Sequence, residues 1–361
     1  MRNVWGRHIV EILRRSTSAY ADDPSIGETI LLMEERDGKT GDRCPPPLRG
    51  ELARLSSLAE SAKQVVMIFD RRRFVIPAFV LLVLFWSSTF SVVKIGVHYS
   101  PPVLFAGLRS IVGGFSMLLA ALLWGGRPSL RRNVGTYASL SMLNVVLFMG
   151  LQTFAIMLLP SGTAAVLIYL QPILTGLLAW FMLGESLSAA KLTGLLLGFC
   201  GIVAVSVGGF SGTVCPAGVA FAVVSALAWA LGTVYFKKVQ DRIPMLWAIA
   251  LSFLFGGMAL LALGLAIEPL AEVSLSGSLV ASLLYSGLVG TAMAWALWLG
   301  LVRAGEASKV AAYVFFVPLA SVAIGALALG ERLSTSLLVG VVLVVSGIYL
   351  VNRTPRRVLP G

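Results

Sequence analysis

Ten long apolar segments, separated by short polar turns, run through residues 74–352 of the chain. An α-helix that crosses the hydrocarbon core of a membrane needs about 20 residues, and each segment comes close to that length. The turns contain the Gly, Pro and Ser residues that end helices, as at Ser100-Pro101-Pro102. The predicted spans are residues 74–96, 101–124, 136–158, 162–183, 189–208, 216–236, 245–266, 277–302, 307–329 and 335–352.

One stretch of this pattern occurs twice, because residues 171–206 and 317–352 align without a gap at a constant offset of 146. Each copy predicts an apolar helix, a short Gly-Glu break and a second apolar helix. The breaks are Gly184-Glu185 and Gly330-Glu331, and each Glu is placed to cap the helix that follows it. The repeat is too long for a solenoid unit and has the size of half a duplicated transporter.

The loop charges indicate how the two halves are oriented. With the N-terminus in the cytoplasm, only Arg332 and Lys94 fall on the outer side. The cytoplasmic set is Arg71, Arg72, Arg73, Arg127, Arg131, Arg132, Lys191, Lys237, Lys238, Arg242, Arg303, Lys309, Arg353, Arg356 and Arg357. This positive-inside pattern predicts both termini in the cytoplasm and localisation in the cell's inner (plasma) membrane.

Five spans per half carry the chain across the membrane, so the second half must be inverted relative to the first. Lys94 then matches Lys237 at an offset of 143, as Trp86 matches Trp229. The sequence therefore predicts an all-α polytopic membrane protein, with ten transmembrane helices as two inverted five-helix repeats. The predicted divisions are an N-terminal cytoplasmic extension at 1–73, repeats at 74–210 and 211–352, and a basic cytoplasmic tail at 353–361.

Composition identifies lipid as the main solvent of this chain. It is 57% hydrophobic and only 12% charged, against roughly 25% charged residues in soluble proteins. Residues 1–70 carry 10 Lys or Arg and 11 Asp or Glu, whereas residues 71–361 carry 18 and 6. The excess positive charge belongs to the hydrophobic part, where it suits an anionic membrane surface. We therefore expect the lipid bilayer, and no nucleic acid, as a partner.

Motifs for enzyme chemistry are missing from the sequence. The two histidines, His8 and His98, are far apart, and there is no H-E-x-x-H motif, membrane-embedded Asp pair or P-loop. The cysteines Cys44, Cys200 and Cys215 have no metal or redox spacing. We expect no catalytic residue, no metal site and no cofactor, and the chain is predicted not to be an enzyme.

Polar residues inside the apolar segments are costly in lipid and should face the bundle interior. Arg109 could be a counter-charge for an anionic substrate group, or a structural residue that binds helix ends. Lys94, near a helix end, could guide a carboxylate or extend to the interface. Asn144, Gln152 and Gln171 could either bridge helices or line a cavity.

Aromatic residues form a second group of candidates. Trp and Tyr usually occupy membrane interfaces, but Trp86, Tyr169, Trp229 and Tyr313 lie well inside their segments. A central cavity lined by aromatic and a few polar groups would suit amphipathic metabolites. Ordinary helix packing is the alternative for any one of these residues.

Three motifs resemble those of EamA-type permeases of the drug/metabolite transporter superfamily. They are Trp86-Ser-Ser-Thr-Phe, Leu104-Phe-Ala-Gly-Leu-Arg109 and Tyr169-Leu-Gln-Pro172 through Gly184-Glu185. The second half repeats the last as Phe316-Val-Pro318 through Gly330-Glu331-Arg332-Leu333. The resemblance covers about residues 74–352, and its specificity lies in the order of the motifs together with the duplication.

The resemblance implies export of amino acids or other small metabolites through a cavity between helices 1, 3, 4, 6, 8 and 9. By that resemblance the candidate substrate-binding residues are Trp86, Phe90, Asn144, Tyr169, Trp229, Trp295 and Tyr313. The expected protein is a secondary transporter working by alternating access, as a monomer or weak homodimer with a small-molecule substrate. A nucleotide-sugar or nucleoside carrier is the first alternative, and an intramembrane lipid-modifying enzyme the second.

Residues 1–66 differ from the rest in being polar, and the run Met67-Ile68-Phe69-Asp70 before three arginines resembles the start of an inner-membrane protein. We predict that translation begins at Met67; a genuine cytoplasmic tail is the alternative. N-terminal sequencing of protein from the native host tests this prediction. A recovered peptide spanning residues 40–66 would contradict it.

Overall fold

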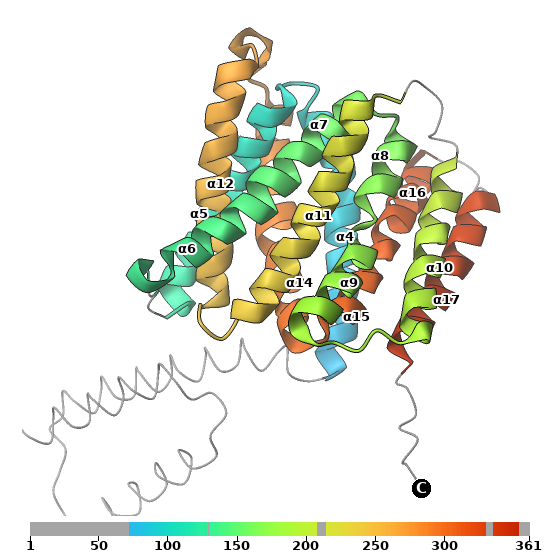
Figure 1. Cartoon of the computed structure of the whole chain (residues 1–361). Helices are drawn as coiled ribbons and strands as arrows, with labels where there is room; N and C mark the ends of the chain where they lie inside the picture. The colour runs from blue at the N-terminus through green and yellow to red at the C-terminus, as the bar shows by residue number, and fades with distance from the viewer. Residues whose placement is uncertain (1–71, 127, 129, 208–213, 330–334, 354–361) are drawn as a thin grey trace, which may run out of the picture. The chain divides into compact units, whose positions relative to one another are not determined.

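The computed structural model describes residues 72–353 apart from 127, 129, 208–213 and 330–334. The described part is helical and contains no strand (Figure 1). Ten of its helical stretches are long and apolar enough to cross a membrane. The predicted all-α polytopic fold is confirmed.

The two halves of the chain follow the same order of helix types. The first five spans are α4 (Arg72–Gly96), α5 (Pro102–Trp124), α6–η1–α7 (Leu130–Ser141, Met142–Gly150, Leu151–Leu158), α8–α9 (Ser161–Ile168, Gln171–Leu183) and α10 (Ala189–Ser206). The second five are α11 (Pro216–Val239), α12 (Met245–Ile267), α13–η4–α14 (Gly277–Tyr285, Ser286–Met293, Ala294–Ala304), α15–η5–α16 (Ala307–Ala312, Tyr313–Phe315, Phe316–Leu329) and α17 (Thr335–Asn352). A short helical turn, η3 (Leu270–Glu272), lies between α12 and α13.

Some helices run past the predicted apolar limits. The third span begins at Leu130 instead of residue 136, and the sixth ends at Val239 instead of residue 236. Hydropathy marks only the part of a helix that lies in hydrocarbon, and these added turns carry exposed or half-buried basic side chains. Lys237 and Lys238, in the last turn of α11, also suit the negative end of the helix dipole.

Irregular helix geometry occurs at matching places in both halves. The third span contains the π-helix η1 and the eighth contains the π-helix η4, at residues 142–150 and 286–293. The fourth span is broken between α8 and α9, and the ninth is interrupted by the 3₁₀ turn η5. π-Helical turns are rare and often lie at functional sites. These duplicated irregularities therefore indicate where the bundle departs from simple packing.

Two helices of the first repeat pack against the equivalent helices of the second repeat. Helix α5 packs against α12, and α10 packs against α17 (Figure 1). A Cβ on Gly194 would lie 2.5 Å from the carbonyl oxygen of Gly347, and one on Gly347 would lie 2.5 Å from that of Gly194. Small residues let membrane helices approach this closely. Such reciprocal contacts are those expected of inverted repeats related by a two-fold axis.

The direction of packing is antiparallel in both pairs. Gly107 faces Leu261 while Gly114, further along α5, faces Leu254 earlier in α12. The carboxylate of Glu268, at the end of α12, accepts hydrogen bonds from backbone N–H groups at the start of α5. The predicted inversion of the two five-helix repeats is thereby confirmed.

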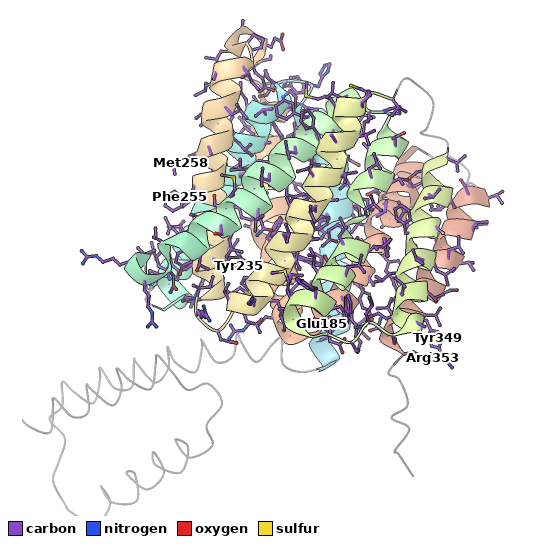
Figure 2. The ribbon with its side chains drawn as sticks, viewed as in Figure 1. Glu185, Tyr235, Phe255, Met258, Tyr349 and Arg353 are labelled. Carbon is purple, nitrogen blue, oxygen red and sulfur yellow. The ribbon has the colours of Figure 1, made fainter. Side chains whose placement is uncertain are left out.

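The bundle surface is apolar along its length and charged at one end. Phe255 and Met258 point outward from α12, as lipid-facing side chains should (Figure 2). We call the end that carries Glu185 and Arg353 the basic end (Figure 2). Its described cations are Arg131, Arg132, Lys191, Lys237, Lys238, Arg242, Arg303, Lys309 and Arg353. The opposite end carries Lys94 alone within the described ranges.

Replacement of Gly194 by Ala is predicted to force α10 and α17 apart, because the new methyl group meets a backbone oxygen that cannot move aside. Overpacking of this kind costs about 1–3 kcal/mol. The melting temperature of the purified protein in detergent should fall. Gly135→Ala is the matched control, since no atom lies within 4 Å of a Cβ there and Ala is the better helix former. Equal melting temperatures for the two variants would contradict the prediction.

Candidate functional site

A cavity with about 120 Å³ of free volume lies in the bundle between spans of both repeats. Its described lining residues are Trp86, Thr89, Val93, Arg109, Phe148, Met149, Gln152, Thr153, Ile156, Ile168, Tyr169, Trp229, Gly290, Trp295 and Val317. The duplicated irregular segments border it: Phe148 belongs to η1, Gly290 to η4, and Tyr169 to the break after α8. The lining extends from mid-bundle toward the end opposite the basic end, as the positions of Val93 and Ile156 near their helix ends indicate.

Aromatic rings form one wall of the cavity around the local two-fold axis. Trp86 and Trp229 occupy equivalent positions in the two repeats, and their ring centroids are 5.6 Å apart in an edge-to-face arrangement. Trp295 lies 6.4 Å from Trp86, and Phe148 stacks on Trp229 at 4.6 Å. Contact between symmetry-related tryptophans places the axis at this cluster.

The aromatic packing continues below the cavity toward the basic end. Trp298, one turn further along α14 than Trp295, is fully buried and lies 5.7 Å from Trp86. Nearer the basic end, Phe79 of α4 stacks on Tyr313 of η5 with centroids 4.1 Å apart. These layers separate the cavity from the basic end.

The structure brings five of the predicted residues together. Trp86, Arg109, Tyr169, Trp229 and Trp295 all line the cavity, although they come from five different spans. Gln152, for which the sequence left cavity lining and helix bridging open, lines it as well.

Other predicted residues lie elsewhere. Asn144 is buried at the contact between η1 and α11, where its side chain packs on the backbone of Gly232. Tyr313 is held in its stack on Phe79 and does not belong to the cavity lining. The side chain of Phe90 lies outside the described residues.

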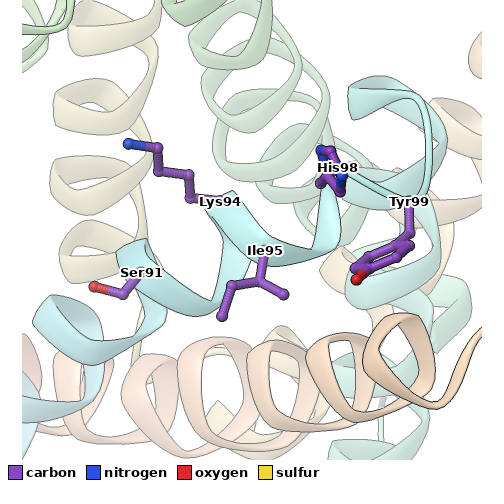
Figure 3. Close-up of a pocket in the computed structure, with 5 residues that line it drawn as sticks. All are labelled: Ser91, Lys94, Ile95, His98 and Tyr99. Atoms are coloured by element: carbon purple, nitrogen blue, oxygen red, sulfur yellow. The ribbon is translucent and has the colours of Figure 1, made fainter.

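Lys94 belongs to a separate hollow at the end of α4 (Figure 3). This hollow has a volume of about 530 Å³, and Ser91, Ile95, His98 and Tyr99 line it with Lys94. Lys94 and His98 are exposed, and all five residues come from the last turns of one helix and the turn that follows. We regard it as a surface hollow, because its described walls do not enclose a ligand.

Several lining residues escaped the sequence reasoning. Phe148 and Ile156 lie four residues before and after Gln152, so the face of one predicted span could have identified them. Gly290 and Val317 had no such signal, because apolar and small residues are common everywhere in the spans. These two lining positions were therefore beyond a pattern-based prediction.

Polar groups around the cavity differ in how well they are satisfied. The hydroxyls of Thr89 and Thr153 donate to carbonyl oxygens of their own helices, at 2.6 Å and 2.8 Å. The Nε of Arg109 and the Nε1 of Trp229 are buried and have no hydrogen-bond partner within the described part of the chain. Since buried donors are normally paired, these two are unusual.

A polar network joins the two repeats at the basic end. The carboxylate of Glu185 accepts hydrogen bonds from the backbone N–H groups of Ala307 and Ser308, at 2.6 Å and 3.1 Å, and from the Ser308 hydroxyl. The prediction that Glu185 caps the following helix is wrong. Ser188 caps α10, and the turn after Gly184 directs the Glu185 side chain to the start of the ninth span. The second break, at Gly330-Glu331, lies outside the described residues.

Lys191 completes this network from the first turn of α10. Its Nζ donates to Glu306 at 2.8 Å and to the Ser308 hydroxyl at 2.9 Å, and the side chain is almost fully buried. Lys309 also donates to Glu306, at 2.6 Å. Partial burial favours the neutral form of Glu306, but hydrogen bonds and charge from Lys191 and Lys309 outweigh it. The pKa of Glu306 is therefore lowered from its ordinary value.

At the opposite end, a simpler contact joins the two repeats. Glu268 accepts hydrogen bonds from the N–H groups of Val103 and Leu104, at 2.9 Å and 2.7 Å. Here too a carboxylate of one repeat caps a helix of the other, where the dipole favours negative charge. The contact lies on the α5–α12 pair, away from the residues that line the cavity. Among the described residues no cluster of His, Cys, Asp or Glu is arranged to hold a metal ion.

The fold and the central cavity define a multi-pass membrane protein of the transporter class. The sequence profile of the EamA-like transporter family matches residues 73–207 and 216–353. The chain belongs to this family of transporters, and the family prediction is confirmed. The two matches correspond to the two five-helix repeats.

Named relatives support the same class. The chain is 39% identical to the uncharacterized transporter YvbV of Bacillus subtilis, over 75% of this chain and 89% of that protein. It is 27% identical to a probable amino-acid metabolite efflux pump of Salmonella typhimurium, over 76% and 96%. A solved crystal structure with 22% sequence identity has a TM-score of 0.66 and covers 78% of this chain and 97% of its own. That likeness shows the fold.

The lowered pKa of Glu306 predicts a pH-dependent stability. Its contribution is present above the pKa of an unfolded glutamate, about 4.3, and is lost as the pH falls through the lower folded value. Glu306→Gln should therefore lower the melting temperature at neutral pH and flatten its fall between about pH 5 and pH 3. Glu272→Gln, an exposed residue of η3, is the control. Melting curves for Glu306→Gln that run parallel to wild type across this range would refute the prediction.

Proposed function

We propose that the protein is a secondary transporter of the cell's inner membrane that exports small metabolites such as amino acids by alternating access. The observation that carries this proposal is the position of the cavity, at the interface of two inverted repeats and around the contact between Trp86 and Trp229. Inverted-repeat transporters bind substrate at this place. The name of the Salmonella typhimurium relative supports amino-acid metabolites as the substrate group.

The orientation follows from the loop charges. The positive-inside rule places the basic end in the cytoplasm, with both termini on that side. The cavity then lies toward the outer face, and the described structure corresponds to an outward-facing state. In the inward-facing state the polar network at the basic end and the Phe79–Tyr313 stack would separate.

The coupling mechanism is constrained by the acidic residues. None of the spans contains an Asp or Glu at mid-membrane, so a carboxylate that could carry a coupled proton is missing from them. We propose facilitated diffusion or exchange as the mode of transport.

Transport by the purified protein in liposomes tests the proposal. A panel of radiolabelled amino acids and related metabolites is loaded on one side, and flux is followed down its gradient. Exchange predicts that unlabelled substrate on the opposite side accelerates the flux. No gradient-dependent flux for any member of the panel would contradict the proposed function.

Trp86→Ala and Trp229→Ala should each lower the flux of an identified substrate by about tenfold or more. Each variant removes an aromatic wall of the cavity, and a ring contact of this kind contributes about 0.5–1.5 kcal/mol beyond its buried area. Trp180→Ala is the matched control, because Trp180 of α9 is 55% exposed and does not line the cavity. Trp86→Phe, which keeps an aromatic ring, is the control for misfolding and should keep part of the flux. Unchanged flux in both alanine variants would contradict the aromatic-cavity model.

A further inference from the structure

We propose that Arg109 binds the acidic group of the transported molecule, so that the substrates are small carboxylates with an apolar or aromatic body. This inference rests on the proposed transport function, and it names the substrate class. It starts from the charge that the cavity holds and the groups around that charge.

Arg109 places an unbalanced positive charge in the cavity wall. Among the described lining residues it alone is charged, and its buried Nε has no hydrogen-bond partner there. The described acidic residues all lie in turns between spans or at helix ends: Glu185, Asp241, Glu268, Glu272 and Glu306. A guanidinium stays protonated in proteins, and an unpaired charge within the membrane is costly. A ligand that supplies the counter-charge would therefore be favoured.

Two buried donors at the cavity lack a partner within the described part of the chain. They are the Nε of Arg109 and the indole N–H of Trp229. A bound molecule that brings hydrogen-bond acceptors would satisfy both. A carboxylate matches this need, because its two oxygens accept from a guanidinium in a bidentate arrangement.

The remaining walls of the cavity are apolar and indicate an apolar body for the rest of the ligand. Trp86, Trp295 and Phe148 present ring surfaces, and Ile156, Ile168 and Val317 add aliphatic ones. The free volume of about 120 Å³ is below the roughly 300 Å³ of ordinary ligand pockets, which favours a small molecule over a nucleotide sugar. The described lining has no carboxylate for an ammonium group, so an amino group is permitted but is not needed for binding.

Arg109 has no counterpart in the second repeat. The offset of 143 that relates Trp86 to Trp229 relates Arg109 to Ser252, which is neutral and buried in α12. The cavity thus receives one positive charge from one repeat. A substrate with one anionic group suits this arrangement better than a dianion or a neutral compound.

Intrinsic tryptophan fluorescence provides a binding assay that does not depend on transport. Three tryptophans line the cavity, so a ligand bound there should change the emission of the purified protein in detergent. The probes are 3-phenylpropanoate, phenylalanine and the neutral 3-phenylpropanol, which share one aromatic ring. Wild type should bind both carboxylates in a saturable manner. It should bind the alcohol at least about tenfold more weakly, since charge-assisted hydrogen bonds are the strong ones.

Variants then assign the effect to Arg109. Arg109→Gln should weaken binding of both carboxylates by about tenfold or more, to the level of the alcohol, while Arg109→Lys keeps part of the preference. Lys94→Gln is the matched control, because Lys94 is the other cation in this part of the bundle and does not line the cavity. The comparison of probes on wild type needs no variant, so it stands even if Arg109→Gln fails to fold.

The outcomes separate this inference from the proposed function. Equal binding of alcohol and acid by wild type, no binding of either carboxylate, or full carboxylate preference in a folded Arg109→Gln would overturn the carboxylate site. Flux of a substrate with no dependence on its carboxylate would also overturn it while leaving transport intact. Carboxylate binding as predicted, without flux of any bound compound in liposomes, would instead overturn the transport proposal.

Discussion

The rest of the structure depends on the close antiparallel contact between matching helices of the two repeats. Lipid gives helices no hydrophobic reason to associate, so backbone approach through small residues has to supply the contact energy. Gly194 with Gly347, and Gly107 with Leu261, bring α10 to α17 and α5 to α12 at backbone distance. Both contacts cross between the repeats, so neither repeat is a separate half of the bundle. The interleaving places helices of both repeats around one axis, and the cavity lies where Trp86 meets Trp229 on it.

A two-fold arrangement alone would leave the cavity equally open to both ends, and the differences between the repeats decide which end is closed. Phe79 and Tyr313 stack near the basic end, whereas the equivalent positions in the other repeat are Ala222 and Leu167. Lys191 ties the same end to Glu306, and its equivalent is Leu337. The closure thus consists of one ring stack and one ion pair that is exposed on its Glu306 side, and a partly exposed ion pair contributes modestly to stability. A closure made of so few contacts can be exchanged for another set without unfolding the scaffold.

Much of this fold could be predicted from the chain because the membrane imposes simple rules. Span length, the gapless repeat at 171–206 and 317–352, and the loop charges together determined the number of helices and the inversion. The site could be predicted in part: Trp86, Trp229 and Arg109 stood out because large or charged residues are rare in mid-span. Two features were out of reach. The partner of Glu185 is 122 residues away in the sequence, so capping rules pointed to the wrong helix. The stack that removes Tyr313 from the cavity depends on tertiary packing alone.

The two repeats share the features that build the scaffold and differ in the features that carry charge. What is duplicated is structural: the glycine contacts, the π-helices η1 and η4, and the breaks of the fourth and ninth spans. The features that occur once are charged side chains. Arg109 has Ser252 as its equivalent in the other repeat, and the buried Lys191 has Leu337. A scaffold with matching halves can have two conformations of similar energy, which alternating access requires. In the proposed function, the single charge of Arg109 sets the ligand preference of the cavity, and Lys191 strengthens the closure at one end. Substitution of the polar residues that lack a counterpart should therefore change specificity or direction more than substitution of the duplicated residues does.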